Sequence, residues 1–397
     1  MLTRNKLLFN SKRHLITSID SIKSKINPQT ALSFEQEYKI RSSLEKLITD
    51  YSTKKLPKIT LDSLINLSNT LQKNDPITLN IKTLNYLTIY NIKRLKEFRS
   101  LPYLTVLNPY ISSTYELYLK SLELLLNISN LEKINDSELI LTKLIEFQEI
   151  HRDAIPTLSK GFQEVSKFYP KFLIVKFLNN HFNDKINMET ITNNYIKTLN
   201  SNNSQDNIGI IDKNLKISEL IKTYGGFVND MTFIKYYKQV PIEIDFGENI
   251  KFPYIGQHLE YIITEILKNS IRSHIESNKS DLPILITIVE NSKTKDGKRS
   301  LGIRFRDEGG GIPTEIEQNI FDYSFSSVAK LEKNQGMVDN SIPGEGINTV
   351  AGMGYGLPLT KAYVEQFGGR LELQSCYGLG TDVYVELIGP DSCLINT

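Results

Sequence analysis

Four polar residues recur at intervals of three and four positions along the segment 258–277, and they could perform acid–base or metal-binding chemistry. They are Tyr261, Glu265, Asn269 and Arg272. A carboxylate can accept a proton, an amide oxygen can bind a hard cation, and Lys268 and Arg272 could neutralise negative charge. The apolar residues between them repeat with the period of a helix, so the four share one face and the apolar stripe lies on another. Alone the pattern is weak, because a charged helix face is more often simply solvated.

An acid followed by three glycines lies where a β run ends. Asp307 is separated by Glu308 from Gly309, Gly310 and Gly311. Glycine has no Cβ, so this backbone can approach a ligand closely while the carboxylate accepts a hydrogen bond from it. The alternative interpretation is a flexible turn that binds nothing.

A third segment is rich in glycine and precedes a helix that we expect to end at Phe367. It contains Gly352, Met353, Gly354, Tyr355, Gly356 and Leu357. Glycines ahead of a helix N-terminus expose amide N–H groups that can face a phosphate. The loop before it, from Gly336 through Gly346, is also rich in glycine and could act as a lid.

The order of these three segments is more specific than any one of them. The order resembles that of the ATP-binding superfamily of gyrase, Hsp90, histidine kinases and MutL. It consists of a helix with an acid and an Asn, a strand followed by Asp-x-Gly-Gly-Gly, a lid, and Gly-x-Gly-x-Gly before a helix. The resemblance implies an α/β sandwich that holds ATP with Mg²⁺. The sequence contains no Gly-x-x-x-x-Gly-Lys-Ser/Thr, so a P-loop is excluded.

The same resemblance implies a role for each site residue. Asn269 would supply an oxygen to the Mg²⁺ that bridges the phosphates, and is the expected metal ligand. Asp307 would bind the adenine amino group, and Thr381 would help to hold the base. The full set of implied nucleotide-binding residues is Asn269, Arg272, Asp307, Gly309, Gly311, Gly352, Met353, Gly354, Tyr355, Gly356, Leu357 and Thr381.

Within this superfamily, the segment 265–273 looks like the helix box of the mitochondrial 2-oxo acid dehydrogenase kinases. The segments 101–111 and 156–161 are similar to parts of the helical domain of that family, and the resemblance covers about Phe34 to Gly389. The resemblance implies a protein serine kinase of the pyruvate dehydrogenase kinase type, which phosphorylates and inactivates the E1α subunit. The fungal enzymes of this type look most similar. Glu265 is then the candidate catalytic base for the substrate serine, the alternative being that it holds a water molecule of the Mg²⁺.

Other functions stay open. Tyr261 stands where pyruvate dehydrogenase kinases commonly have a His, and the segment 378–384 also leans toward the branched-chain type, so a branched-chain 2-oxo acid dehydrogenase kinase is the main alternative. The segment 151–158 loosely resembles the phosphoacceptor box of histidine kinases, in which His151 would carry the phosphate. A conformational ATPase would instead use Glu265 to activate water.

Two halves of different character must position these residues. From Phe34 to Ile196 the apolar residues have helical spacing, glycine is almost absent, and prolines separate four or five expected helices of an antiparallel, four-helix-type bundle. Most glycines and the strand-like runs come later, and they predict an α/β sandwich with a mixed sheet and helices on one face. We predict a transit peptide over 1–20, a helical regulatory and lipoyl-domain-docking domain over 21–207, an ATP-binding domain over 208–390 and a short tail over 391–397.

The first residues are basic, poor in acid and amphipathic, which is typical of an organelle transit peptide. Arg4, Lys6, Lys12 and Arg13 all precede the first acid, Asp20. The family resemblance also favours a transit peptide and implies location in the mitochondrial matrix.

The resemblance also implies the partners of the protein. They are E1α, the lipoyl domain of the dihydrolipoyl acyltransferase core, and a second subunit in a homodimer or in a heterodimer with a related kinase.

Composition excludes several other classes of protein. Lys plus Arg number 47 against 45 for Asp plus Glu, so binding of nucleic acid through bulk charge is disfavoured. No apolar run approaches the ~20 residues of a membrane span. The two cysteines, Cys376 and Cys393, cannot form a four-thiolate zinc site. There is no tryptophan, which puts in doubt the Asp-Trp tail that crosses between subunits in many animal enzymes of the family.

Overall fold

The computed structural model describes residues 33–72, 75–129, 133–200, 206–291, 298–317, 319–322 and 355–395. Contacts between residues divide the chain into two compact units. The first contains residues 1–58, 67–169 and 187–199, and the second contains 59–66, 170–186 and 200–397. The predicted transit peptide, the lid from Gly336 to Gly346, and the predicted site residues Gly352, Met353 and Gly354 lie outside the described residues.

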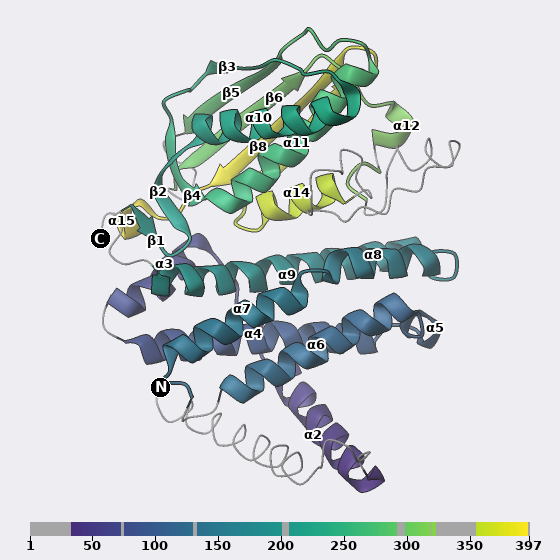
Figure 1. Cartoon of the computed structure of the whole chain (residues 1–397), viewed down its shortest axis with the longest axis vertical. Helices are drawn as coiled ribbons and strands as arrows, with labels where there is room; N and C mark the ends of the chain where they lie inside the picture. The colour runs from purple at the N-terminus through teal and green to yellow at the C-terminus, as the bar shows by residue number, and fades with distance from the viewer. Residues whose placement is uncertain are drawn as a thin grey trace. The chain divides into compact units, whose positions relative to one another are not determined.

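Helices form the described chain from Phe34 to Asn200, as the spacing of apolar residues predicted (Figure 1). Their bounds are α2 (Phe34–Ser52), α3 (Leu61–Gln72), α4 (Pro76–Arg99), α5 (Tyr103–Val106), α6 (Pro109–Ile128), α7 (Ser137–His151), α8 (Ala154–Val165) and α9 (Lys171–Asn200). They outnumber the four or five predicted, because a single turn such as α5 is too short to produce a periodic pattern.

Proline and a capping side chain begin two of these helices. Asp75 accepts a backbone N–H at 3.0 Å, and Pro76 occupies the first turn of α4. At the start of α6, Asn108 accepts the backbone N–H of Tyr110 at 3.0 Å, and Pro109 occupies the first turn. A helix cannot use its first N–H groups, so proline costs nothing there and its fixed φ suits the first turn. The prolines that separated the expected helices therefore also fix where α4 and α6 start.

The first unit is built around α4 and α6, which pack against each other. α4 also contacts α2 and α7, and α6 contacts α7 and α8. Buried apolar residues fill the interior, among them Leu87, Leu122, Leu144 and Leu158. Gly161 marks the closest approach of α8 to α6, because a Cβ at this position would lie 2.7 Å from the Ile111 side chain.

The second unit contains a five-stranded mixed sheet, as predicted. Its strands lie in the order β3-β5-β6-β8-β7, with β3 parallel to β5 and every other pair antiparallel. A smaller antiparallel sheet has the order β1-β2-β4. The bounds are β1 (Asn207–Ile208), β2 (Ile211–Lys216), β3 (Ile242–Phe246), β4 (Lys251–Ile255), β5 (Ile284–Asn291), β6 (Ser300–Asp307), β7 (Arg370–Cys376) and β8 (Gly380–Ile388).

Three helices of this unit cover one face of the larger sheet, and Figure 1 shows two of them, α10 and α11, lying across it. The described helices that lie wholly within the unit are α10 (Ile217–Tyr236), α11 (Gly256–Glu276), α12 (Thr314–Glu317), α14 (Gly356–Glu365) and α15 (Ser392–Ile395), and parts of α3 and α9 also belong to it. α11 packs between α10 and α14. Side chains alternate along β8, so Val383 and Val385 are buried while Tyr384 is only half-buried. Within the described ranges, no helix is long and apolar enough to cross a lipid bilayer.

Candidate active site

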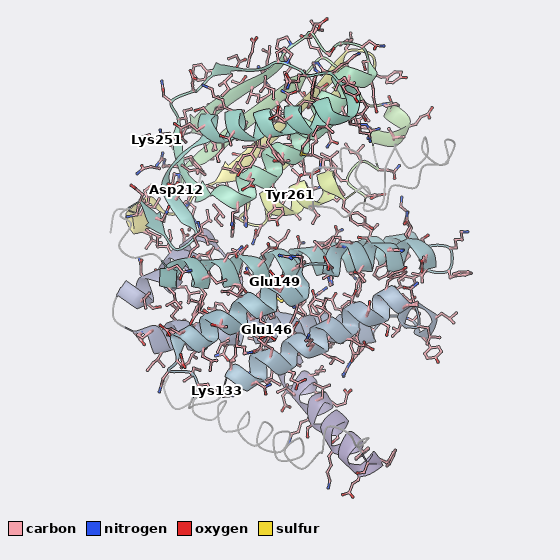
Figure 2. All side chains as sticks on the ribbon, in the orientation of Figure 1. Lys133, Glu146, Glu149, Asp212, Lys251 and Tyr261 are labelled. Atoms are coloured by element: carbon pink, nitrogen blue, oxygen red, sulfur yellow. The ribbon has the colours of Figure 1, made fainter. Side chains whose placement is uncertain are left out.

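α11 positions the acid and the amide that the sequence singled out. Its apolar stripe is buried, including Ile262 and Ile266, so the opposite side of the helix is fixed relative to the sheet. Glu265 and Asn269 lie one turn apart on that side. Asn269 is exposed, and its amide makes no hydrogen bond to any residue within the described ranges. Figure 2 shows Tyr261 on the same helix, and its ring lies 4.9 Å from that of Tyr363 in α14.

Both oxygens of the Glu265 carboxylate lie close to another group, Oε1 to Lys268 and Oε2 to Gly356. Lys268 Nζ lies 2.7 Å from Glu265 Oε1, and the two side chains are only 15% and 13% exposed. Glu265 Oε2 faces Gly356, the first residue of α14, so closely that a Cβ at Gly356 would overlap it. The structure therefore brings the start of the glycine-rich helix directly against the candidate base.

Asp307 ends β6 in a buried position below α11. Its Oδ2 accepts a hydrogen bond from Ser270 Oγ at 3.2 Å, and its Oδ1 accepts one from Gly309 N at 3.0 Å. Burial raises the pKa of this carboxyl, while the hydrogen bond from Gly309 works against that rise. Each carboxylate oxygen has a second lone pair, so the group can still accept a hydrogen bond from a ligand.

Thr381 faces Asp307 across the sheet, in register between β8 and β6. Its hydroxyl lies 3.0 Å from Ser375 Oγ, which also accepts a hydrogen bond from Ile312 N at 2.7 Å. Gly311 in this loop has a φ of +66°, which favours glycine, and a Cβ there would overlap the carbonyl at position 376. The glycine loop after Asp307 is thus fixed against the β7–β8 hairpin.

Two residues that the sequence analysis did not identify fix the same loop to α11. His274 Nε2 accepts a hydrogen bond from Glu308 N at 3.0 Å, so its other nitrogen, Nδ1, carries the proton that is donated to Lys279 O at 3.1 Å. Lys279 Nζ donates to Gly309 O at 3.0 Å and to Gly378 O at 3.2 Å. The loop residues that they contact are 30 to 99 positions away along the chain, so no local pattern could have revealed these loop contacts.

The remaining described residues of the predicted nucleotide site differ in their burial and in their contacts. Tyr355 is buried, with its ring 5.9 Å from that of Phe182, so it anchors the start of α14 by packing. Leu357 is half-buried. Arg272 Nε donates to Glu276 Oε1 at 2.6 Å on the same helix, which leaves its guanidinium engaged within α11.

His151, the candidate phosphoacceptor of the histidine-kinase alternative, is buried in the first unit. Its Nε2 lies 2.9 Å from Ser121 Oγ, and its ring packs against those of Tyr118 and Phe147. An imidazole in this position is not accessible to a phosphoryl donor. The geometry therefore disfavours the histidine-kinase alternative.

A mixed sheet covered by helices on one face, with a buried carboxyl at a strand end and glycine-rich turns beside it, is the architecture of a nucleotide-binding ATPase domain. Residues 255–389 match the family described as histidine kinase-, DNA gyrase B-, and HSP90-like ATPases. Residues 58–212 match the family described as mitochondrial branched-chain alpha-ketoacid dehydrogenase kinase. The two matches fall in the predicted order along the chain.

Relatives align with most of the chain. It is 40% identical to "[Pyruvate dehydrogenase (acetyl-transferring)] kinase 1, mitochondrial" of Saccharomyces cerevisiae over 364 residues, which are 90% of this chain and 91% of the relative. It is 27% identical to the corresponding mitochondrial kinase of Arabidopsis thaliana, over 74% of this chain and 80% of the relative. It is 25% identical to kinase isozyme 1 of Homo sapiens, over 75% and 70%. The chain belongs to the mitochondrial pyruvate dehydrogenase kinase family.

Proposed function

We propose that this protein is a serine kinase that uses Mg-ATP to phosphorylate and inactivate the E1α subunit of the mitochondrial pyruvate dehydrogenase complex. The observation that carries the proposal is that one helix, α11, presents Glu265 against the start of α14, presents an exposed Asn269 one turn later, and reaches Asp307 through Ser270. The proposed base and metal ligand thereby lie on one helix, which is hydrogen-bonded to the proposed adenine acceptor at the end of β6.

The residues around Asp307 fit the adenine of ATP. The carboxyl is buried and its two hydrogen bonds leave acceptor positions for an amino group, while Thr381 lies opposite it. A hydrogen bond to a buried carboxylate is strong and selective, because water cannot compete for it. This arrangement supports recognition of adenine at the end of β6.

The residues also fit Mg²⁺. Within the described residues, no group of three or more His, Cys, Asp or Glu side chains could hold a metal by itself. Mg²⁺ does not require one, since it binds through one or two protein oxygens together with phosphates and water. Asn269 offers such an oxygen, because its amide is exposed and makes no hydrogen bond within the described ranges. When bound there, the ion would neutralise charge on the phosphates.

Transfer of a phosphoryl group depends mainly on position and electrostatics. Glu265 would orient the substrate serine and accept its proton, which a carboxylate of fixed orientation can do efficiently. The backbone at the start of α14 would face the phosphates.

The pyruvate type is favoured over the branched-chain type. The match over residues 58–212 is described by the branched-chain name. The relatives that cover both halves of the chain are named pyruvate dehydrogenase kinases. A branched-chain substrate remains the second candidate because Tyr261 occupies the position of the family His.

The proposed partners and location follow from the family. The helical domain, residues 21–207, would dock the lipoyl domain of the acyltransferase core, and residues 1–20 would direct the protein to the mitochondrial matrix. The uncovered face of the larger sheet would join two kinase subunits. That face has a hollow of about 400 Å³ lined by residues that include Thr287, Val289 and Tyr384.

Two substitutions test the proposed site. Asn269→Ala should abolish Mg-ATP binding measured by calorimetry, because the metal loses its protein oxygen. Glu265→Gln should leave ATP binding intact and remove most phosphate transfer to E1α, a loss of roughly 100-fold or more, which is the typical contribution of a general base. If Glu265→Gln keeps its turnover, Glu265 is not the base.

A further inference from the structure

We infer that Lys268 is a positioning residue, whose ammonium group fixes the Glu265 carboxylate for the substrate serine and does not bind phosphate. The inference rests on the proposed kinase function, and it changes the role expected for this lysine. From the sequence, Lys268 was a candidate for neutralising phosphate charge. In the structure, its ammonium group contacts the candidate base.

The pair is more buried than most short-range ion pairs among the described residues, with Arg94–Glu97 comparably buried at 0% and 23% exposed side chains. Lys268 Nζ lies 2.7 Å from Glu265 Oε1, with side chains 15% and 13% exposed. The comparable pair Lys216–Glu219 spans three positions as well, but its side chains are 52% and 64% exposed. Exposed pairs are screened by water and hold no fixed geometry, whereas a largely buried pair is screened much less.

The second oxygen of Glu265 is constrained from the other side. It lies against Gly356, where α14 begins, and there is no room for a Cβ between them. With Oε1 bound by Lys268 and Oε2 lying against Gly356, the movement of the carboxylate is restricted on both sides. A base that must meet a serine hydroxyl at hydrogen-bond distance benefits from such a fixed orientation, since small displacements slow the reaction strongly.

A phosphate-binding lysine would present its ammonium toward the nucleotide as a point charge. Lys268 instead makes a charge-assisted hydrogen bond to a carboxylate three positions before it. Removing this lysine should therefore impair the chemical step and leave nucleotide binding unchanged.

The test compares Lys268→Met, Lys268→Arg, Glu265→Gln and the double variant K268M/E265Q of the full chain. We expect Lys268→Met to lower kcat for E1α phosphorylation at least tenfold, with the ATP Kd within twofold of the wild type. Lys268→Arg, which keeps the cation, should recover a large part of kcat. The double variant should be no slower than Glu265→Gln alone, because both substitutions disable one unit.

Lys216→Met is the matched control, since it removes a lysine from an exposed pair of the same spacing and should change neither kcat nor the ATP Kd. A raised ATP Kd with kcat preserved in Lys268→Met would overturn the inference in favour of phosphate binding. Multiplicative losses in the double variant would also overturn it.

A second measurement needs no kinase activity, so it separates this inference from the proposed function. The shifts in the urea midpoint caused by Lys268→Met and Glu265→Gln should be non-additive in the double variant, because each removes the same ion pair. Additive shifts would contradict the pairing. Absence of phosphate transfer by the wild type would contradict the proposed function and leave this unfolding result to decide the pairing.

Discussion

At the scale of single residues, burial of the Asp307 carboxyl costs stability, and a ligand that donates a hydrogen bond to it would offset part of that cost. Asp307 lies in a buried position that raises the pKa of its carboxyl, so the ionised form is disfavoured in the fold. Ser270 and Gly309 each supply one hydrogen bond to it, which offsets part of this cost. A further donor from a nucleotide base would satisfy another acceptor position, and the site gains most from a ligand that provides one.

His258 is a buried titratable residue next to the site. Burial lowers the pKa of its imidazole to about 3, so the ring is neutral under ordinary conditions. It stacks on Phe367 with ring centres 5.8 Å apart and meets Tyr363 edge-on at 4.9 Å. These contacts join the start of α11 to the end of α14, and a charged imidazole would be poorly tolerated among them.

His258→Phe should make the protein less sensitive to acid. Above pH 6.5 the histidine is neutral in both the folded and the unfolded state, whereas below this pH only the unfolded chain takes up the proton. The wild type should therefore lose about 2 kcal/mol more of its free energy of unfolding between pH 7.5 and pH 5 than the variant does. Urea denaturation at the two pH values measures the difference, and equal losses in both proteins would contradict it.

The residues proposed for the active site, and those that hold them in place, differ in how far the sequence indicates them. Glu265, Asn269 and Asp307 stand in short, ordered motifs, and the structure places them along α11 and at the end of β6. His274 and Lys279 carry no such motif, because their partners belong to loops that only the folded chain brings near. Local spacing therefore indicates the groups that could act, and long-range contacts determine what holds them.

At the scale of elements, the junction of α11 and α14 is the critical feature of the site. The two helices pack against each other, and the first residue of α14 lies against the Glu265 carboxylate. A Cβ at position 356 would overlap Glu265 Oε2, so any side chain there would force the end of the Glu265 side chain to shift. The geometry of the base thus depends on where α14 begins.

Gly356→Ala should lower kcat for E1α phosphorylation at least tenfold, since the added Cβ overlaps Glu265 Oε2. Gly226→Ala in α10 is a matched control, because among the described residues no atom beyond its chain neighbours and its own helix backbone lies within 4 Å of the added Cβ. The control should keep full activity and gain about 0.5 kcal/mol in its free energy of unfolding, as alanine favours a helix interior. Steady-state kinetics and urea denaturation of the two variants make the comparison, and unaltered kcat in Gly356→Ala would contradict the proposed contact.

Elements with a strong pattern were predicted well from the sequence. The strand-like runs expected in the second half of the chain correspond to β5, β6, β7 and β8, and the helical spacing after Phe34 corresponds to α2 through α9. The strands β1, β2, β3 and β4 were not predicted, since runs of two to six residues give no clear period. Grouping of 170–186 with the second unit depends on tertiary packing, which periodicity does not report.

At the scale of the molecule, a helical unit and a nucleotide-binding unit are joined in one chain. The matches to known families follow the same order, with the dehydrogenase-kinase family over residues 58–212 and the ATPase family over 255–389. A near-neutral net charge of +2 is consistent with a protein that finds its substrate through specific surfaces and not through bulk charge. We propose that the helical unit recognises the complex and that the unit with the larger sheet transfers the phosphate.

The most direct test of the proposed function incubates the purified full chain with labelled ATP, Mg²⁺, and the E1 proteins of the pyruvate and branched-chain complexes in parallel. We expect acid-stable label on serine of the pyruvate E1α, much less on the branched-chain E1α, and loss of label with Glu265→Gln. Label on the branched-chain protein alone, acid-labile label, or ATP hydrolysis without transfer to either protein would contradict it.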